Sequence, residues 1–148
     1  MKVKLIASDE HYDRLAQELR SLGIEIDDEA RLVLQEADAW LNHLTCRKGN
    51  ELHRVATREI VFIESLSHDV LVHTVQNVFK AGERLWQLEN QLNPQEFLRI
   101  SNAVIVAKEQ IRSIKPALSQ KFLLTMSDGS KVDVTRTYYH AFRGAMGI

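Results

Sequence analysis

Long apolar runs and cysteine pairs are both missing from this chain. No stretch of about 18 apolar residues exists, and the N-terminus (MKVKLIASDEHYDRL) meets charged residues too early for a signal peptide or a membrane span. The one cysteine, Cys46, has no second thiol for a disulfide or a cysteine-based metal site, so we expect it to be a buried strand residue. These absences predict a cytoplasmic protein.

Glycine is also scarce, and the motifs of common enzymes are absent. The six glycines are scattered, and the chain contains no phosphate-binding loop, no G-x-S-x-G turn and no helical His-x-x-x-His pair. His68-Asp69 and His73 invite a metal-site interpretation, but alternation along a strand would send His68 and His73 to opposite faces. We therefore expect no catalytic residue, no metal site, no cofactor and no small-molecule substrate.

Charge is distributed unevenly, although the formal net charge is only −1. Residues 1–40 hold 5 Lys/Arg against 10 Asp/Glu, and residues 41–148 hold 14 against 10, which gives −5 and +4. The basic part is suited to a polyanion, whereas the acidic part is suited to protein contacts.

Residues 1–40 show a small β-α-β pattern. KVKLIAS is typical of a strand, and residues 9–23 of a helix that ends at Gly23. The apolar residues expected on one face of this helix are Tyr12, Leu15, Ala16, Leu19 and Leu22. Strands IEI and RLVLQ follow, separated by an acidic turn. So small a sheet must bury its apolar face either on the domain that follows or on a second copy of itself, and we favour the second copy, which predicts a segment for interaction or dimerisation.

Residues 41–148 carry the pattern of a mainly β (α+β) domain with short helices. A hairpin is expected around Lys48-Gly49-Asn50, then strands over EIVFIES, DVLVHT and TVQNVFK. ERLWQLENQL predicts a helix with an apolar stripe of leucines. Strands resume over FLRI, AVIVA, IRSIK, KFLLTM and KVDVT, with Asp128-Gly129 expected in a type I′ turn.

The last helix is predicted over RTYYHAFRGAMG, with Thr135 as its N-cap. Its inner face should carry Tyr138, Ala141, Phe142 and Ala145. Two other aromatic residues, Trp86 and Phe97, are expected in the core.

The order of these segments is more specific than any single motif. IVFIES, the Leu-x-x-Leu-Glu-x-x-Leu helix LWQLENQL, the Phe-x-Arg of FLRISNAVIVA and the Asp-Gly hairpin before VTR follow one another in register. Over residues 42–147 the chain thereby resembles the LytTR family of bacterial DNA-binding domains. The resemblance implies a compact β domain that presents loops to successive major grooves of double-stranded DNA.

The resemblance also implies which residues meet DNA. The base-reading positions fall on His68, Asn102 and Arg136, whose side chains suit contacts to base edges. Neighbouring residues expected to contact phosphates are Ser67, Arg99, Ser101, Lys108, Thr135 and Arg143, with a structural salt bridge as the equal alternative for Arg99. His73 is expected to be a packing residue of the strand.

The chain departs from the family pattern at two places. Ala107 stands where an asparagine usually ends the Ile-Val strand, and Ile100-Ser101-Asn102-Ala103 replaces the usual His-Arg/Lys-Ser loop. The second departure bears on base preference and not on the fold.

We therefore expect a sequence-specific transcriptional regulator. The resemblance implies a homodimer on paired direct repeats and, as a further partner, a membrane inhibitor or another regulatory protein. A protein-interaction module without DNA affinity is the main alternative, and a small metal-dependent enzyme is the other one.

Overall fold

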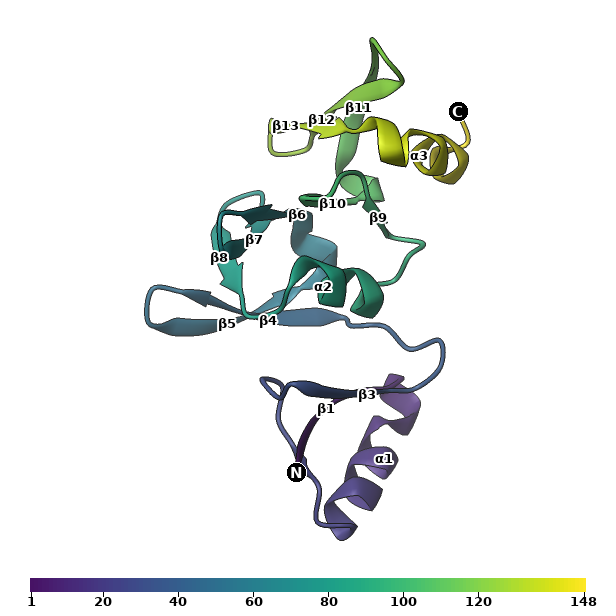
Figure 1. Cartoon of the computed structure of the whole chain (residues 1–148). Coiled ribbons are helices and arrows are strands. Elements are labelled where there is room, and N and C mark those ends of the chain that lie inside the picture. The colour runs from purple at the N-terminus through teal and green to yellow at the C-terminus, as the bar shows by residue number, and fades with distance from the viewer. The chain divides into compact units, whose positions relative to one another are not determined.

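The computed structural model describes residues 1–148 and divides the chain into two compact units, Met1–Leu41 and Asn42–Ile148 (Figure 1). The predicted mainly β fold with short helices, preceded by a β-α-β segment, is confirmed. No helix has both the length and the apolar character needed to cross a membrane.

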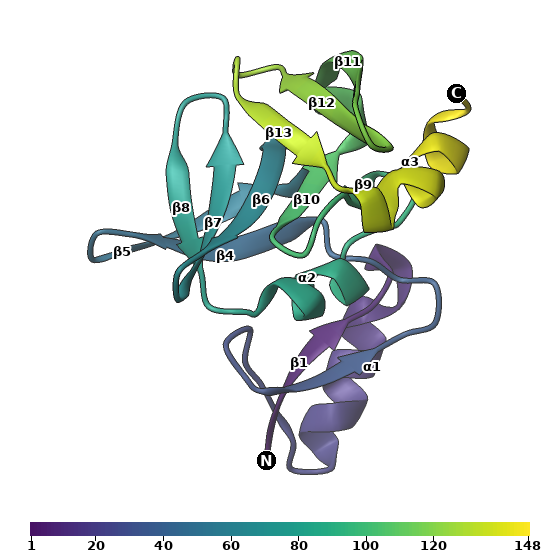
Figure 2. The ribbon, with the colours of Figure 1, turned by 45° about the horizontal axis from the view of Figure 1, so that its top comes forward.

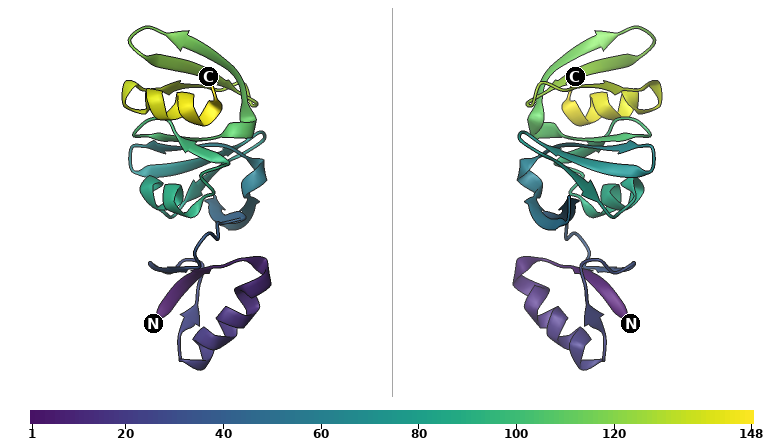
Figure 3. Two further views of the ribbon diagram at one scale, coloured as in Figure 1. Left: turned by 90° about the vertical axis from the view of Figure 1, so that its right-hand side faces the viewer. Right: turned by 90° about the vertical axis from the view of Figure 1, so that its left-hand side faces the viewer.

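The smaller unit is a three-stranded parallel sheet with one helix. Its elements are β1 (Lys2–Ile6), α1 (Asp9–Ser21), β2 (Glu25–Ile26) and β3 (Leu32–Gln35), and the strand order is β2-β1-β3. The helix contacts β1 and β2. Figure 3 shows it in purple. Ala16 is fully buried as predicted, but Leu22 is 74% exposed, because the helix ends before it at Ser21.

Glu36 fastens the start of α1 to the end of β3. Its Oε1 accepts a hydrogen bond from the Ser8 N–H (3.2 Å), and its Oε2 lies 2.9 Å from His11 Nδ1. The Ser8 N–H bond, helped by His11, lowers the pKa of Glu36 below its ordinary value because both contacts favour the ionised carboxylate. We call these three residues the Glu36 clasp.

The larger unit is built on a seven-stranded antiparallel sheet with the order β5-β4-β8-β7-β6-β10-β9 (Figure 2). Its strands are β4 (His43–Lys48), β5 (Glu51–Ala56), β6 (Ile60–Leu66), β7 (Asp69–Thr74), β8 (Val78–Ala81), β9 (Phe97–Arg99) and β10 (Val104–Ala107). The first hairpin turns as predicted, with Gly49 at φ +62. Cys46 is a buried strand residue, also as predicted.

A second antiparallel sheet, order β11-β12-β13, and the last helix complete the unit. Its elements are β11 (Ile111–Ala117), β12 (Lys121–Met126), β13 (Lys131–Val134) and α3 (Tyr139–Met146). Three-residue 3-10 helices precede β6, β11 and α3: η1 (Thr57–Glu59), η2 (Lys108–Gln110) and η3 (Arg136–Tyr138).

The two faces of the seven-stranded sheet pack against different elements of the same unit. Phe62 and Val106 lie opposite each other on one face and join a core with Phe122, Leu124 and Phe142 from the second sheet and α3. The other face is covered by α2 (Leu85–Gln91), which contacts β6, β9 and β10 (Figure 3). Helix and second sheet therefore hold β6 and β10 from both sides.

The leucine stripe of α2 is buried as predicted, but Trp86 is not in the core. Leu85, Leu88 and Leu92 are at most 6% exposed, whereas Trp86 is 59% exposed. Neighbouring residues of an α-helix point about 100° apart, so turning Leu85 towards the sheet turns Trp86 away from it. Phe97 is buried, as predicted.

The turn at Asp128-Gly129 is not the predicted type I′ turn. Met126 pairs with Ser130 across a three-residue loop, and only Gly129 has a positive φ, +87. A type I′ turn needs a positive φ at both central residues, whereas a left-handed Gly at the end of a three-residue loop is the G1-bulge geometry. Asp128 stabilises this loop instead, since its carboxylate accepts bonds from the N–H and hydroxyl of Ser130.

The start of the last helix also differs from the prediction. Thr135 makes no side-chain cap, because its hydroxyl contacts the Ile100 carbonyl and a 3-10 turn separates it from α3. The shifted start rotates the buried face, which carries Phe142 with Tyr138, Tyr139 and Met146 packed beside it. Ala141 and Ala145 are exposed, contrary to the prediction.

Acid should open the Glu36 clasp. Because the folded pKa of Glu36 is lowered, the clasp contributes stability above the ordinary pKa and loses it as the pH falls through the lowered value. Exchange of the Tyr12 amide, which bonds to the Ser8 carbonyl, should speed up as the pH falls below the ordinary pKa range of a glutamate, after correction for its intrinsic rate. Glu36→Gln should exchange faster already at pH 7; a wild-type pH profile in this variant would contradict the assignment.

Gly129→Ala should destabilise the larger unit by about 1 kcal/mol, because alanine is strained at the positive φ of this loop. No atom lies within 4 Å of the added Cβ, so the backbone is the cause. Gly144→Ala is the matched control: its Cβ also meets open space, but its φ is helical, and the change should stabilise by up to about 1 kcal/mol. Chemical denaturation measures both, and equal effects would refute the turn assignment.

Candidate nucleic-acid interface

His68 lies at the tip of the hairpin between β6 and β7. Leu66 pairs with Asp69, so Ser67 and His68 form the two-residue turn, and Ser67 takes φ +56. Both turn residues are exposed. The turn thus presents the imidazole to solvent from the end of two central strands.

Asn102 lies on the connection between β9 and β10. Ile100 anchors this loop, because its side chain is fully buried and its N–H donates to the Val104 carbonyl. Ser101 is only 9% exposed, and its Oγ accepts a bond from the Ala103 N–H (3.2 Å). Asn102, in contrast, is exposed. The loop therefore turns one amide side chain outward from a buried base.

Arg136 begins η3, directly after β13, and is exposed. The preceding residue is tied to the Asn102 loop: the Thr135 N–H donates to the Ile100 carbonyl (3.0 Å). Two residues further on, the Tyr138 hydroxyl donates to Asn102 Oδ1 (3.3 Å). The loop and the start of η3 are thus joined on both the backbone and the side-chain level.

Pairing of β6 with β10 brings the His68 turn to the same end of the unit. Glu64 lies opposite Val104, and the Ser65 N–H donates to the Ala103 carbonyl (2.7 Å). Because the strands are antiparallel, the end of β6 and the start of β10 share one edge. His68, Asn102 and Arg136 therefore project from separate connections at one end of the larger unit, which we call the loop edge.

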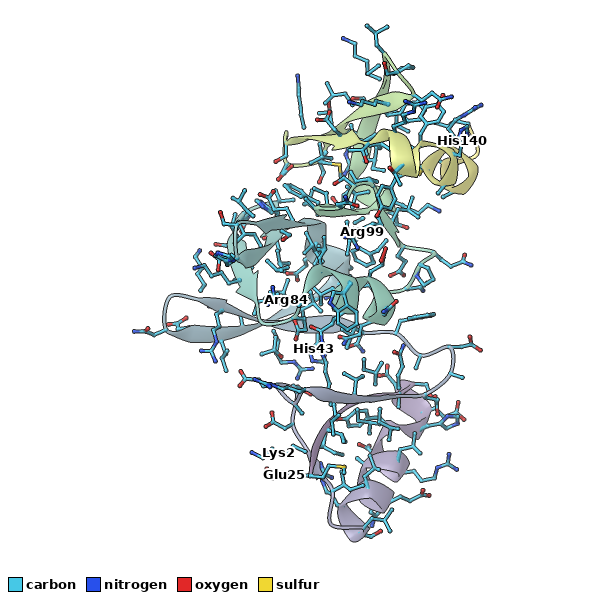
Figure 4. The ribbon with its side chains drawn as sticks, viewed as in Figure 1. Lys2, Glu25, His43, Arg84, Arg99 and His140 are labelled. Atoms are coloured by element: carbon cyan, nitrogen blue, oxygen red, sulfur yellow. The ribbon has the colours of Figure 1, made fainter.

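Arg99, labelled in Figure 4, belongs to β9 and reaches the backbone of the Asn102 loop. Its Nε donates to the Ser101 carbonyl (2.7 Å), and its second guanidinium nitrogen donates to the Asn102 carbonyl (2.6 Å). The third nitrogen contacts Glu89 Oε1 of α2 at 3.2 Å. This contact is the structural salt bridge that the sequence left open as an alternative for Arg99. Only 16% of the Arg99 side chain is exposed.

Only some of the other residues expected to contact phosphates lie at the loop edge. Ser67, Ser101 and Thr135 lie at the loop edge, although the Ser101 and Thr135 hydroxyls are bonded inside it. Lys108 begins η2 beyond the opposite end of β10, about 20 Å from Asn102 at the usual rise of a strand. Arg143 lies on α3, where its Nε donates to the terminal Ile148 carbonyl.

His73 is confirmed as a packing residue. Its ring stacks on Phe62 with centroids 4.0 Å apart, and its Nε2 lies 3.2 Å from Glu64 Oε2. No group of three potential ligand side chains that could hold a metal ion occurs anywhere in the chain. The two histidines of SLSHDVLVHT therefore lie in separate environments, and only His68 is at the loop edge.

Tyr138 and Glu89 are parts of this site that the sequence did not indicate. The sequence pattern assigned Tyr138 only to a buried helix face, and Glu89 only to a family motif. Their partners, Asn102 and Arg99, are 36 and 10 residues away along the chain, and local periodicity carries no signal for such contacts.

Comparison with known proteins matches the larger unit. The family model described as LytTr DNA-binding domain matches residues 50–147. The chain is 29% identical over 104 residues to the sensory transduction protein LytT of Bacillus subtilis, covering 70% of this chain and 43% of that protein. It is 20% identical over 137 residues to the transcriptional regulatory protein LytR of Staphylococcus aureus, covering 92% and 56%.

A solved structure shares the fold. The LytTr DNA-binding domain of a putative methyl-accepting/DNA response regulator from Bacillus cereus superposes with a TM-score of 0.70 at 23% identity, covering 73% of this chain and 99% of that one. The chain spans about half the length of the curated relatives that it matches.

Proposed function

Because the chain belongs to the family of LytTr DNA-binding domains, matched over residues 50–147, we propose that it is a sequence-specific transcriptional regulator that binds double-stranded DNA. The family expected from the segment order is thus confirmed. The observation that carries the proposal is the convergence of His68, Asn102 and Arg136, all exposed, on the loop edge. Loops held by a rigid sheet are common places for binding residues.

The side chains at the loop edge suit the major groove. Arg136 can donate two bonds to guanine O6 and N7, and Asn102 can pair with adenine N6 and N7. The bond from Tyr138 uses one lone pair of Asn102 Oδ1, so the amide keeps a second lone pair and both N–H donors for a base. His68 can offer a donor or an acceptor.

Contacts to phosphates would position the protein without reading sequence. The formal charge of +4 over residues 41–148 supports this electrostatic part of binding. We assign phosphate contacts to Ser67 and Arg143, which lie at the loop edge and on the helix that follows Arg136, whereas both donors of Thr135 are already bonded to the Ile100 carbonyl. Lys108 would reach a phosphate only beyond the loop edge.

The smaller unit is assigned a role in protein contacts. Its edge strand β3 exposes Leu32, Val33 and Leu34, each at least 40% exposed, and its formal charge over residues 1–40 is −5. An exposed apolar edge strand is a template for pairing with another chain. We propose that it joins two copies on paired direct repeats in the bacterial cytoplasm, or binds a regulatory protein such as a membrane inhibitor.

The same observations support the second candidate, a protein-interaction module without DNA affinity. The candidates differ in one property, since only a DNA-binding regulator has an affinity for duplex DNA that falls steeply with salt.

Arg136→Ala should relax base choice. Duplex DNA selected for binding from a random pool supplies the preferred site, and the loss of one bidentate base contact should weaken binding to it by about 1 to 3 kcal/mol. Arg112→Ala is the matched control, because Arg112 is an exposed arginine next to η2, beyond the far end of β10. Unchanged binding of Arg136→Ala to the selected site would show that this residue reads no base.

Leu32→Lys combined with Leu34→Lys should abolish self-association if β3 joins two copies. Sedimentation would then give the mass of one chain, and affinity for a paired site should fall while affinity for a single half-site is retained. Leu118→Lys is the control, since Leu118 is 90% exposed in the larger unit. A dimer that survives the β3 substitutions would place the interface elsewhere.

A further inference from the structure

The guanidinium of Arg99 is directed at the backbone of the base-reading loop. Its Nε and one terminal nitrogen donate to the carbonyls of two consecutive residues, Ser101 (2.7 Å) and Asn102 (2.6 Å). We propose that Arg99 is a positioning residue that fixes this loop for base reading and is not itself a phosphate ligand. The inference rests on the function proposed above, which it deepens.

The charge of Arg99 is already matched within the protein. Its third nitrogen lies 3.2 Å from Glu89 Oε1, and the Glu89 side chain is 41% exposed against 16% for the arginine side chain. A charge-assisted pair of this kind holds the guanidinium plane in place. An arginine that binds phosphate needs its donors and its charge directed outwards, whereas here each of the three guanidinium nitrogens has a partner within the protein and the charge is paired with Glu89.

The fork shape of arginine is what this position requires. A planar guanidinium can donate along two directions to adjacent carbonyls and along a third to a carboxylate. A lysine ammonium carries the same charge on one nitrogen and cannot span the Ser101 carbonyl, the Asn102 carbonyl and Glu89 together. Substitution by lysine therefore keeps the positive charge at residue 99 but removes the geometry that reaches all three partners.

Arg99 and Tyr138 hold different parts of the same residue. Arg99 binds the backbone carbonyl of Asn102, and the Tyr138 hydroxyl binds its side-chain Oδ1. With both ends held, the amide is oriented before DNA arrives, and less ordering is needed on binding. Discrimination at the base read by Asn102 should then depend on Glu89, although Glu89 is on α2 and outside the loop edge.

Arg99→Lys, Glu89→Gln and the control Arg112→Lys test the inference in the full chain. Arg112 also donates to a backbone carbonyl, that of Glu109, but in η2 beyond the far end of β10. Dissociation constants are measured on the selected duplex and on a scrambled duplex over a range of salt concentrations. Glu89→Gln covers the case in which Arg99→Lys fails to fold, because Glu89 is exposed and the change is isosteric.

A positioning role predicts a loss confined to the selected duplex. Arg99→Lys should reduce the ratio of selected-duplex to scrambled-duplex affinity by about tenfold, and Glu89→Gln should reduce this ratio by a smaller factor. In both variants the affinity for the scrambled duplex and the salt slope should stay at wild-type values. Arg112→Lys should change none of these. A phosphate contact predicts the reverse, in which Arg99→Lys keeps the ratio; a Glu89→Gln variant with wild-type discrimination would likewise overturn the inference.

Hydrogen exchange without DNA separates this inference from the proposed function. In Arg99→Lys the amides of Ser65 and Ala103, which bond to the loop, should exchange about tenfold faster than in wild type. Unchanged exchange would overturn the positioning role even if DNA binding is sequence-specific. Faster exchange in a chain that shows no preference for any duplex would overturn the proposed function, and with it the base-reading purpose of Arg99.

Discussion

The antiparallel pairing of β6 with β10 is the constraint on which the loop edge depends. It places the end of β6 and the start of β10 at one edge, and the bond from the Ser65 N–H to the Ala103 carbonyl fixes their register there. The hairpin turn of His68 and the loop of Asn102 extend from this edge as a consequence. Arg136 lies at the same edge for a different reason, because the N–H of the preceding residue, Thr135, donates to the Ile100 carbonyl.

The same pairing also fixes the short loops that we propose as a binding surface. β6 and β10 are held from both faces, by α2 on one and by the second sheet with α3 on the other. Their connections are therefore short, anchored by buried residues such as Ile100, and leave only selected side chains exposed. We propose that loops fixed in this way serve in place of the recognition helix that many DNA-binding folds use, and Arg99 extends the fixation to the loop backbone itself.

The parts of this structure that the sequence predicts are those governed by local patterns. Alternating apolar residues give the strands, and the spacing of Leu85, Leu88 and Leu92 gives α2 and its buried face. What the sequence misses depends on contacts distant along the chain or on turn details: the 3-10 start that rotates α3, the three-residue loop at Gly129, and the Tyr138 and Arg99 bonds to the Asn102 loop. The residues proposed to read bases are indicated only by family resemblance, since a histidine, an asparagine and an arginine in loops have no periodicity to mark them.

The central claim is that the three connections of the loop edge read different bases of one site. It is tested most directly by the binding of His68→Ala, Asn102→Ala and Arg136→Ala to every single base-pair variant of the selected duplex. The account predicts that each variant loses preference at its own base pairs and keeps it at those of the other two. Loss of preference at the same positions in all three variants, or at none, would contradict it.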